Sequence, residues 1–213
     1  MLLHTNTDVI ILLASDTIRD MGKNITELEM QQTNKQKLRS LSTRKVYRGD
    51  ISMRLDRFKF GKKVVEKEIV EHSPSVGIIP VLDNYDLVFV AQYRHAIEKT
   101  VLEIPAGKIE KGETPKQAAH REMSEEIGHT GTLAPLLQWY LAPGYSTEVM
   151  QIFIATNLKK LRVRRKLDED ENITIKRMKL ITAVQKCISG DIEDCKTVAA
   201  VLTYARLSQS NII

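Results

Sequence analysis

The sequence predicts an α/β fold, on three observations. Short alternating or continuously apolar runs between residues 45 and 155 are typical of strands. Residues 114–127 have the apolar spacing and end signals of an amphipathic helix. Residues 182–189 and 193–209 indicate two further helices, the last one capped by Asp194 or Thr197. The 213 residues are enough for one domain with a sizeable core.

We divide the chain into three parts. Residues 1–44 are an N-terminal extension, helical or flexible, whose apolar run 9–14 is far too short to span a bilayer and has no secretory signal around it. Residues 45–74 form an N-terminal β portion, and residues 75–213 form the main domain. We therefore expect no membrane segment.

Composition limits the choice of partners. The net charge of +5 and the pI near 9.1 favour anionic partners, whether nucleotides or nucleic acids. The basic run 159–166 has no interleaved aromatic residue for base stacking, which favours a solvated loop over a nucleic-acid site. Cys187 and Cys195 have no CxxC or histidine pattern beside them, as expected for free thiols in a reducing cytoplasm.

The strands differ in burial. Ile51, Met53 and Leu55 alternate before a turn at Gly61 and a second run at 64–72, which predicts a hairpin. The runs 75–82 and 87–94 are apolar almost throughout and predict strands buried on both faces.

The segment 107–129 joins a glycine-rich loop to a helix with clear ends. Thr114 is a good N-cap, Pro115 suits the first helical position and Gln117 completes a capping box. Gly128 marks the far end. The apolar stripe of this helix consists of Ala119, Met123 and Ile127.

Three carboxylates crowd the end of this helix. At about 100° per residue, Glu122, Glu125 and Glu126 share an arc of about 100° beside the apolar stripe. Like charges at this spacing, near the negative end of the helix dipole, disfavour the helix, and Arg121 offsets only part of this through Glu125. A hard divalent cation explains the cluster, and Mg²⁺ prefers such oxygen ligands. An acidic surface helix is the competing interpretation.

The spacing of this segment resembles the Nudix box, a loop–helix–loop that binds Mg²⁺ and diphosphate. The resemblance implies an α/β/α sandwich with a mixed curved sheet, and metal-binding roles for Glu122, Glu125 and Glu126. It implies structural roles for the other matching residues, which are Gly107, Glu113, Arg121 and Gly128. His129 departs from the pattern, because an aliphatic residue is usual there.

Two flanking runs resemble the ADP-ribose pyrophosphatase branch of that family: LEIPAG at 102–107 and APGYSTE at 142–148. The first implies a metal-binding carbonyl at Ala106 and a supporting role for Glu103. Arg94 is either a surface arginine or, as the resemblance implies, a contact to a substrate phosphate. The second run implies substrate contacts from Pro143, Gly144 and Glu148. The alternative is a plain Pro-Gly turn between two strands, which Glu148 caps.

The acidic run 168–171 has two interpretations. Its charge alone indicates a solvated turn beside the basic run. In similar enzymes a loop here supplies a catalytic base and a metal ligand, which implies Glu169 as the base and Glu171 as the ligand.

Together these resemblances imply hydrolysis of ADP-ribose to AMP and ribose 5-phosphate, with Mg²⁺ or alternatively Mn²⁺. Glu122, Glu126 and Glu169 would carry the chemistry, in a cytoplasmic homodimer that exchanges its N-terminal strands. The alternatives are another nucleoside diphosphate derivative (an ADP-sugar, NADH, a dinucleoside polyphosphate or an RNA 5′ end) or a non-catalytic ADP-ribose-binding module.

Overall fold

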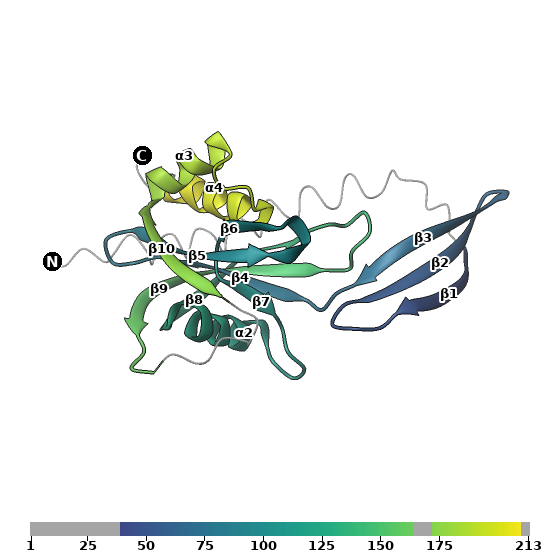
Figure 1. The fold of residues 1–213 in the computed structure, drawn as a ribbon, viewed down its shortest axis with the longest axis horizontal. Helices are drawn as coiled ribbons and strands as arrows, with labels where there is room; N and C mark the ends of the chain where they lie inside the picture. Colours follow the sequence, from purple (N-terminus) through teal and green to yellow (C-terminus); the bar gives the residue numbers. More distant parts are fainter. Residues whose placement is uncertain (1–38, 164–171, 210–213) are drawn as a thin grey trace.

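The computed structural model describes residues 39–163 and 172–209 (Figure 1). Its strands are β1 (Arg39–Tyr47), β2 (Ser52–Phe60), β3 (Lys63–Glu71), β4 (Ser75–Pro80), β5 (Asp86–Arg94), β6 (Lys99–Glu103), β7 (Ala106–Lys108), β8 (His129–Tyr140), β9 (Val149–Lys160) and β10 (Ile173–Lys179). Its helical segments are η1 (His95–Ile97), α2 (Pro115–Glu122), η2 (Met123–Ile127), α3 (Leu180–Ser189) and α4 (Cys195–Gln209).

Two sheets lie between helices, as the predicted α/β/α sandwich requires. One sheet has the order β7-β4-β9-β8 and is mixed, since β4 and β9 run parallel and its other pairs are antiparallel. The other has the order β10-β5-β6 and is antiparallel. Figure 1 shows α2 on one side of these sheets and α3 with α4 on the other.

The core consists of two apolar clusters, one on each face of the sheets. Along β4, Val76 and Ile78 pack in the cluster that includes Ala119 of α2, whereas Ile79 packs in the cluster that includes Val201 of α4. Successive side chains of a strand point to opposite faces, so a strand covered on both faces must be apolar throughout. This confirms the double-sided burial predicted for 75–82, except at its last residue, and for the first half of 87–94, whereas Tyr93 near the end of β5 is 46% exposed.

The box helix begins and ends at the predicted residues, but its last turn is wider than expected. Thr114 and Gln117 form the capping box: the Gln117 backbone N–H donates to Thr114 Oγ1 (3.3 Å), and the Thr114 backbone N–H donates to Gln117 Oε1 (2.8 Å). The apolar stripe is buried. From Met123 to Ile127 the backbone widens into a π-helical turn, and Gly128 closes it with φ of +65°. Such turns occur often at functional sites.

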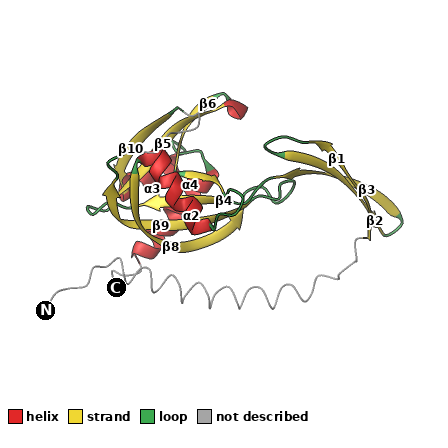
Figure 2. Cartoon of the chain, turned by 90° about the horizontal axis from the view of Figure 1, so that it is seen from below, coloured by secondary structure: helices red, strands yellow, loops and turns green. Residues whose placement is uncertain are grey.

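The N-terminal strands form a separate three-stranded antiparallel sheet, which we call the arm, residues 39–71. The predicted hairpin is present as β2 and β3. β1 adds a third strand that begins at Arg39, so the expected boundary at residue 44 falls inside a strand. The arm extends away from the sandwich in both views (Figures 1 and 2).

The C-terminal helices pack together over the sheets. Asp194 caps α4, since its Oδ2 accepts from the Thr197 backbone N–H (2.9 Å), as the sequence predicted. Cys187 and Cys195 are both free thiols, which was also expected. Within residues 39–163 and 172–209, no helix has the length and apolar character needed to cross a membrane.

Candidate active site

A cleft of about 570 Å³ lies where the box segment meets the ends of β4 and β5. It contains five of the residues predicted to bind metal or substrate, Arg94, Ala106, Glu122, Glu125 and Glu148. Its other lining residues are Asp50, His72, Ser75, Gln92, Tyr93, His95, Gly107, Lys108, Glu110, Arg121, Leu141, Met150 and Lys196.

Gly107 and Glu122 fit together so closely that only glycine is possible without a shift. A Cβ placed on Gly107 would lie 1.8 Å from Glu122 Oε1 and 2.2 Å from its Cδ. The helix therefore delivers a largely buried carboxylate directly onto the backbone of β7. The glycine of the box leaves the space that this carboxylate fills.

Arg121 joins the loop of the box to its helix. Its Nε and Nη2 donate to the two oxygens of Glu113 at 2.9 and 3.1 Å, and Nη2 also donates to the Lys108 carbonyl at 2.8 Å. Its Nη1 donates to Glu122 Oε1 at 2.8 Å and to Glu125 Oε2 at 3.0 Å. The hydrogen bonds to Glu113 and the nearby carboxylates raise the pKa of Arg121 far above its ordinary value, against the opposing effect of burial. One cation thus holds three carboxylates in place.

Glu126 is the most buried of the helix carboxylates, with 2% of its surface exposed. Its Oε2 accepts a hydrogen bond from the Ala106 backbone N–H at 3.1 Å. This contact brings Ala106 of β7, a predicted metal-binding carbonyl, beside the carboxylates of α2 and η2.

The donor set fits a hard divalent cation, because it consists of carboxylate and carbonyl oxygens in the cleft or, for Glu126, in contact with its lining residue Ala106. In the described parts of the chain, no three His, Cys, Asp or Glu side chains converge on a single point as a closed metal centre. Instead, Arg121 bonds to Glu122 and Glu125, and the Ala106 N–H bonds to Glu126. A bound cation would share these carboxylates with their present partners.

Arg94, which lines the cleft, forms an ion pair with the buried Glu103. Arg94 Nε donates to Glu103 Oε1 at 2.7 Å and Nη2 donates to Oε2 at 2.8 Å, a two-bond fork. Lys196 contacts the same Oε2 and also Asp194 Oδ1, the latter at 2.9 Å. Burial opposes ionisation of Glu103, but the Arg94 hydrogen bonds and the Lys196 charge outweigh it and lower its pKa.

Of the substrate-binding residues predicted in the 142–148 turn, one lines the cleft and two do not. Glu148 lines the cleft and its Oε1 accepts from Ser75 Oγ at 2.7 Å, with His72 Nδ1 at 3.6 Å. Pro143 and Gly144 are exposed and do not line the cleft of this chain. The reason is that their turn bonds to the end of the arm: the Val70 N–H donates to the Tyr145 carbonyl at 2.8 Å. Glu169 and Glu171 lie outside the described residues.

His129, the departure from the box pattern, is buried at the start of β8. Its Nδ1 lies 2.6 Å from the Ile127 carbonyl oxygen. This hydrogen bond satisfies a carbonyl at the helix end, so a polar side chain is tolerated where an aliphatic one is usual.

Lys196 and the Tyr93–His95 pair also line the cleft, although no sequence motif predicts them there. Tyr93 and His95 flank Arg94, and their rings pack edge to face with centroids 5.0 Å apart. The signal for Lys196 was its place in the first turn of α4, where we assigned only capping residues.

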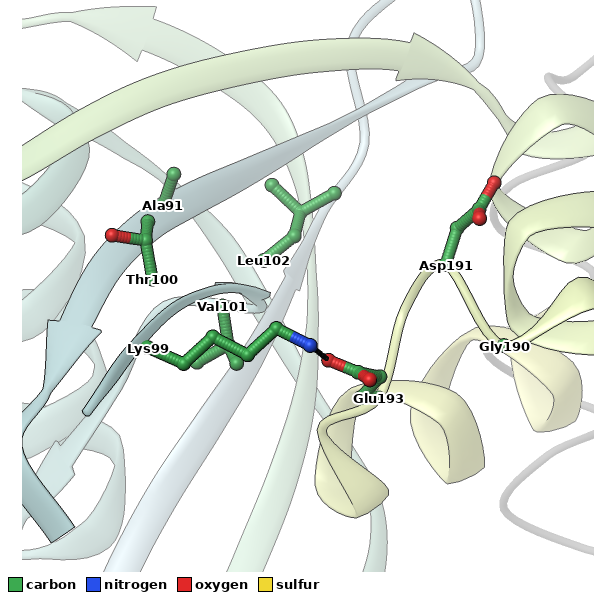
Figure 3. A pocket seen from close by; sticks show the side chains of 8 residues that line it. All are labelled: Ala91, Lys99, Thr100, Val101, Leu102, Gly190, Asp191 and Glu193. Carbon is green, nitrogen blue, oxygen red and sulfur yellow. Dashed lines mark hydrogen bonds and ion pairs between the residues drawn. The ribbon is translucent and has the colours of Figure 1, made fainter. Parts of the chain in front are cut away.

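A second pocket of about 410 Å³ lies between β6 and the α3–α4 turn (Figure 3). Lys99 and Glu193 form an ion pair across it. It contains none of the box carboxylates, so we place the chemistry in the larger cleft.

Comparisons with known proteins identify the family of the chain. The family described as the NUDIX domain matches residues 71–189. An ADP-ribose pyrophosphatase of Bacillus subtilis (strain 168) is 37% identical over 149 residues, which cover 70% of this chain and 80% of that protein. A methanol dehydrogenase activator of Bacillus methanolicus is 37% identical over 146 residues, covering 68% of this chain and 78% of that protein. A crystal structure described as an ADP compounds hydrolase shares the fold, with a TM-score of 0.73 at 23% identity over 83% of this chain and 96% of that one. The chain belongs to the Nudix family.

Proposed function

We propose that this Nudix protein hydrolyses the diphosphate of ADP-ribose, releasing AMP and ribose 5-phosphate. The observation that carries the proposal is a single cleft lined by Glu122 and Glu125 and also by Arg94. The carboxylates suit a divalent cation and the guanidinium suits a phosphate. The relative named ADP-ribose pyrophosphatase supports the choice of substrate.

Nudix hydrolases act with a divalent metal ion, and we propose Mg²⁺ here, with Mn²⁺ as the alternative. Glu122, Glu125 and Glu126, with the Ala106 carbonyl, would hold it. When bound, such an ion neutralises charge that develops on the diphosphate and lowers the pKa of water. Arg121 keeps the carboxylates of this set in place through its bonds to Glu122 and Glu125.

The remaining residues bind the substrate or accept a proton. Arg94 donates hydrogen bonds to the diphosphate, and Glu148 contacts the substrate from its place beside Ser75, the first residue of β4. The oxygen of water bonds to one phosphorus, the bond from that phosphorus to the bridging oxygen breaks, and Glu169 accepts the proton of the water. Glu169 as the base and Glu171 as a further metal ligand rest on the resemblance of the 168–171 run.

A substrate panel at fixed Mg²⁺ tests the proposal, with ADP-ribose, ADP-glucose, NADH and diadenosine polyphosphates as substrates and AMP release as the readout. We expect the highest kcat/KM for ADP-ribose and none in EDTA. Preference for another member of the panel would support diphosphate hydrolysis but overturn the choice of ADP-ribose as the substrate. The relative named methanol dehydrogenase activator makes this panel necessary, because its identity to this chain is the same. Tight binding of ADP-ribose without turnover would favour the binding module.

We further propose that the chain is a homodimer joined through the arm. A three-stranded sheet needs a covered apolar face to be stable, and no apolar side chain of the arm is buried. The exposed apolar residues of the arm are Leu41, Val46, Tyr47, Ile51, Phe60, Val64 and Val65. Analytical ultracentrifugation should give twice the chain mass. A chain that sediments as a monomer at micromolar concentration would overturn this proposal.

A further inference from the structure

We propose that Lys196 is a positioning residue for the diphosphate: it shares the buried Glu103 carboxylate with Arg94 and so keeps the outer edge of Arg94 directed into the cleft. The inference rests on the proposed function of the cleft as a diphosphate site. It adds a residue from the last helix to a site built by the box and the sheets.

The contacts form a chain of three side chains. Glu103 ends β6 and is almost fully buried, and both of its oxygens receive hydrogen bonds from Arg94. Lys196 Nζ bonds to Glu103 Oε2, on the side away from the Arg94 Nε bond, and is itself held by Asp194 Oδ1 at 2.9 Å. Lys196 is largely buried, with 10% of its side chain exposed, and it lines the cleft.

The guanidinium of Arg94 has an inner edge, Nε and Nη2, that bonds to Glu103, and an outer edge that includes Nη1. A guanidinium has five N–H groups, and Glu103 uses Nε and one position on Nη2. Within residues 39–163 and 172–209, Nη1 makes no hydrogen bond, and 41% of the Arg94 side chain is exposed where it lines the cleft. The inner edge is therefore fixed, and the outer edge can donate to two phosphate oxygens.

The charges of this cluster balance one another. Arg94 and Lys196 are cationic and Glu103 and Asp194 are anionic, so the four groups are neutral together. Lys196 therefore acts by compensating the buried Glu103 carboxylate and holding it against Arg94, and not by adding net positive charge to the cleft. The lowered pKa of Glu103 is consistent with this, since Lys196 contributes to it beside Arg94.

The Lys196 ion pair is not needed to hold α4 in place. Asp194 caps the helix through the Thr197 N–H, and Thr197 Oγ1 accepts from the Ile104 backbone N–H at 2.8 Å. Ala200 and Val201 are fully buried in the core. Because these contacts fix the helix independently, we assign the ion pair to the cleft.

A double-mutant cycle tests the inference in the full chain. We measure the Kd of inorganic pyrophosphate with Mg²⁺ by calorimetry, and KM and kcat for ADP-ribose, in the wild type, Lys196→Met, Arg94→Ala and the double variant. We expect Lys196→Met to raise Kd and KM about tenfold with kcat changed less than threefold, but to have less than a twofold effect in the Arg94→Ala background. Lys196→Arg should restore both constants.

Lys99→Met is the matched control, because Lys99 forms an ion pair with Glu193 beside the same helix but outside the cleft. It should leave Kd and KM unchanged. Circular dichroism checks the fold, and Lys196→Gln replaces Lys196→Met if that variant does not fold. Equal effects of the Lys196 change with and without Arg94 would overturn the inference, as would an equal effect of Lys99→Met. If Lys196 and Arg94 are coupled in pyrophosphate binding but the chain releases no AMP from ADP-ribose, the proposed function is wrong and the role of Lys196 stands. If the chain releases AMP but the two residues are not coupled, the proposed function stands and the role of Lys196 is wrong.

Discussion

Substituting Gly107 by alanine should displace the Glu122 carboxylate while changing the stability of the fold very little. The new Cβ would lie 1.8 Å from Glu122 Oε1, whereas real Cβ contacts essentially never fall below 3.0 Å, so the carboxylate must move by about 1.2 Å. The colliding atoms are the end of a flexible side chain, which can swing aside at small cost in folding free energy. Its position on the cleft wall is lost in that movement.

We expect Gly107→Ala to lower kcat/KM for ADP-ribose about 100-fold, the usual effect of a 1 Å misplacement in an active site. The melting temperature should change by only a few degrees. Gly144→Ala is the matched control, because a Cβ there meets no atom within 4 Å and its backbone is not left-handed. The assay is AMP release under saturating Mg²⁺, with thermal denaturation of the same samples. Wild-type kcat/KM in Gly107→Ala would refute the argument that the Glu122 carboxylate must occupy this space.

Three further predictions concern stability. Thr114→Ala removes the N-cap acceptor of the box helix and should cost about 1 kcal/mol in the free energy of unfolding, measured by urea denaturation, with turnover little changed. Arg121→Met leaves Glu113 and Glu122 without their cation and should cost about 3 kcal/mol, and a loss below about 1 kcal/mol would contradict the bridging role of Arg121. The pKa of Glu103 is lowered in the folded chain, so the stability that its ion pairs add is complete above the ordinary carboxyl pKa of about 4.3 and is lost as pH falls through the lowered value. Urea denaturation from pH 6 to pH 3 should therefore show a shallower decline in Glu103→Gln than in the wild type.

The parts of the fold that follow local rules could be predicted from the sequence. The capping box of Thr114 and Gln117 depends only on residues three apart, and the burial of 75–82 follows from its continuous apolar character. The family spacing implied a structural role for Gly107, but its close contact with Glu122 needed the structure.

Other features depend on contacts that no local pattern records. Lys196 meets Glu103 across 93 positions of the chain, so nothing near DIEDCKT marks it as a cleft residue. β1 has no buried face, and its sequence therefore lacks the alternation that would have placed its start at Arg39. The π-helical turn at 123–127 likewise has no distinguishing residue pattern.

The proposed chemistry is tested by comparing AMP and ribose 5-phosphate release from ADP-ribose by the wild type and by Glu126→Gln, with Mg²⁺ and with EDTA. We expect equal amounts of both products from the wild type and none in EDTA. In a folded Glu126→Gln variant the rate should be lower by about three orders of magnitude, because the buried carboxylate beside Ala106 loses its charge. Near-normal turnover by Glu126→Gln would remove this residue from the metal site. Product release that persists in EDTA would contradict the proposed chemistry as a whole.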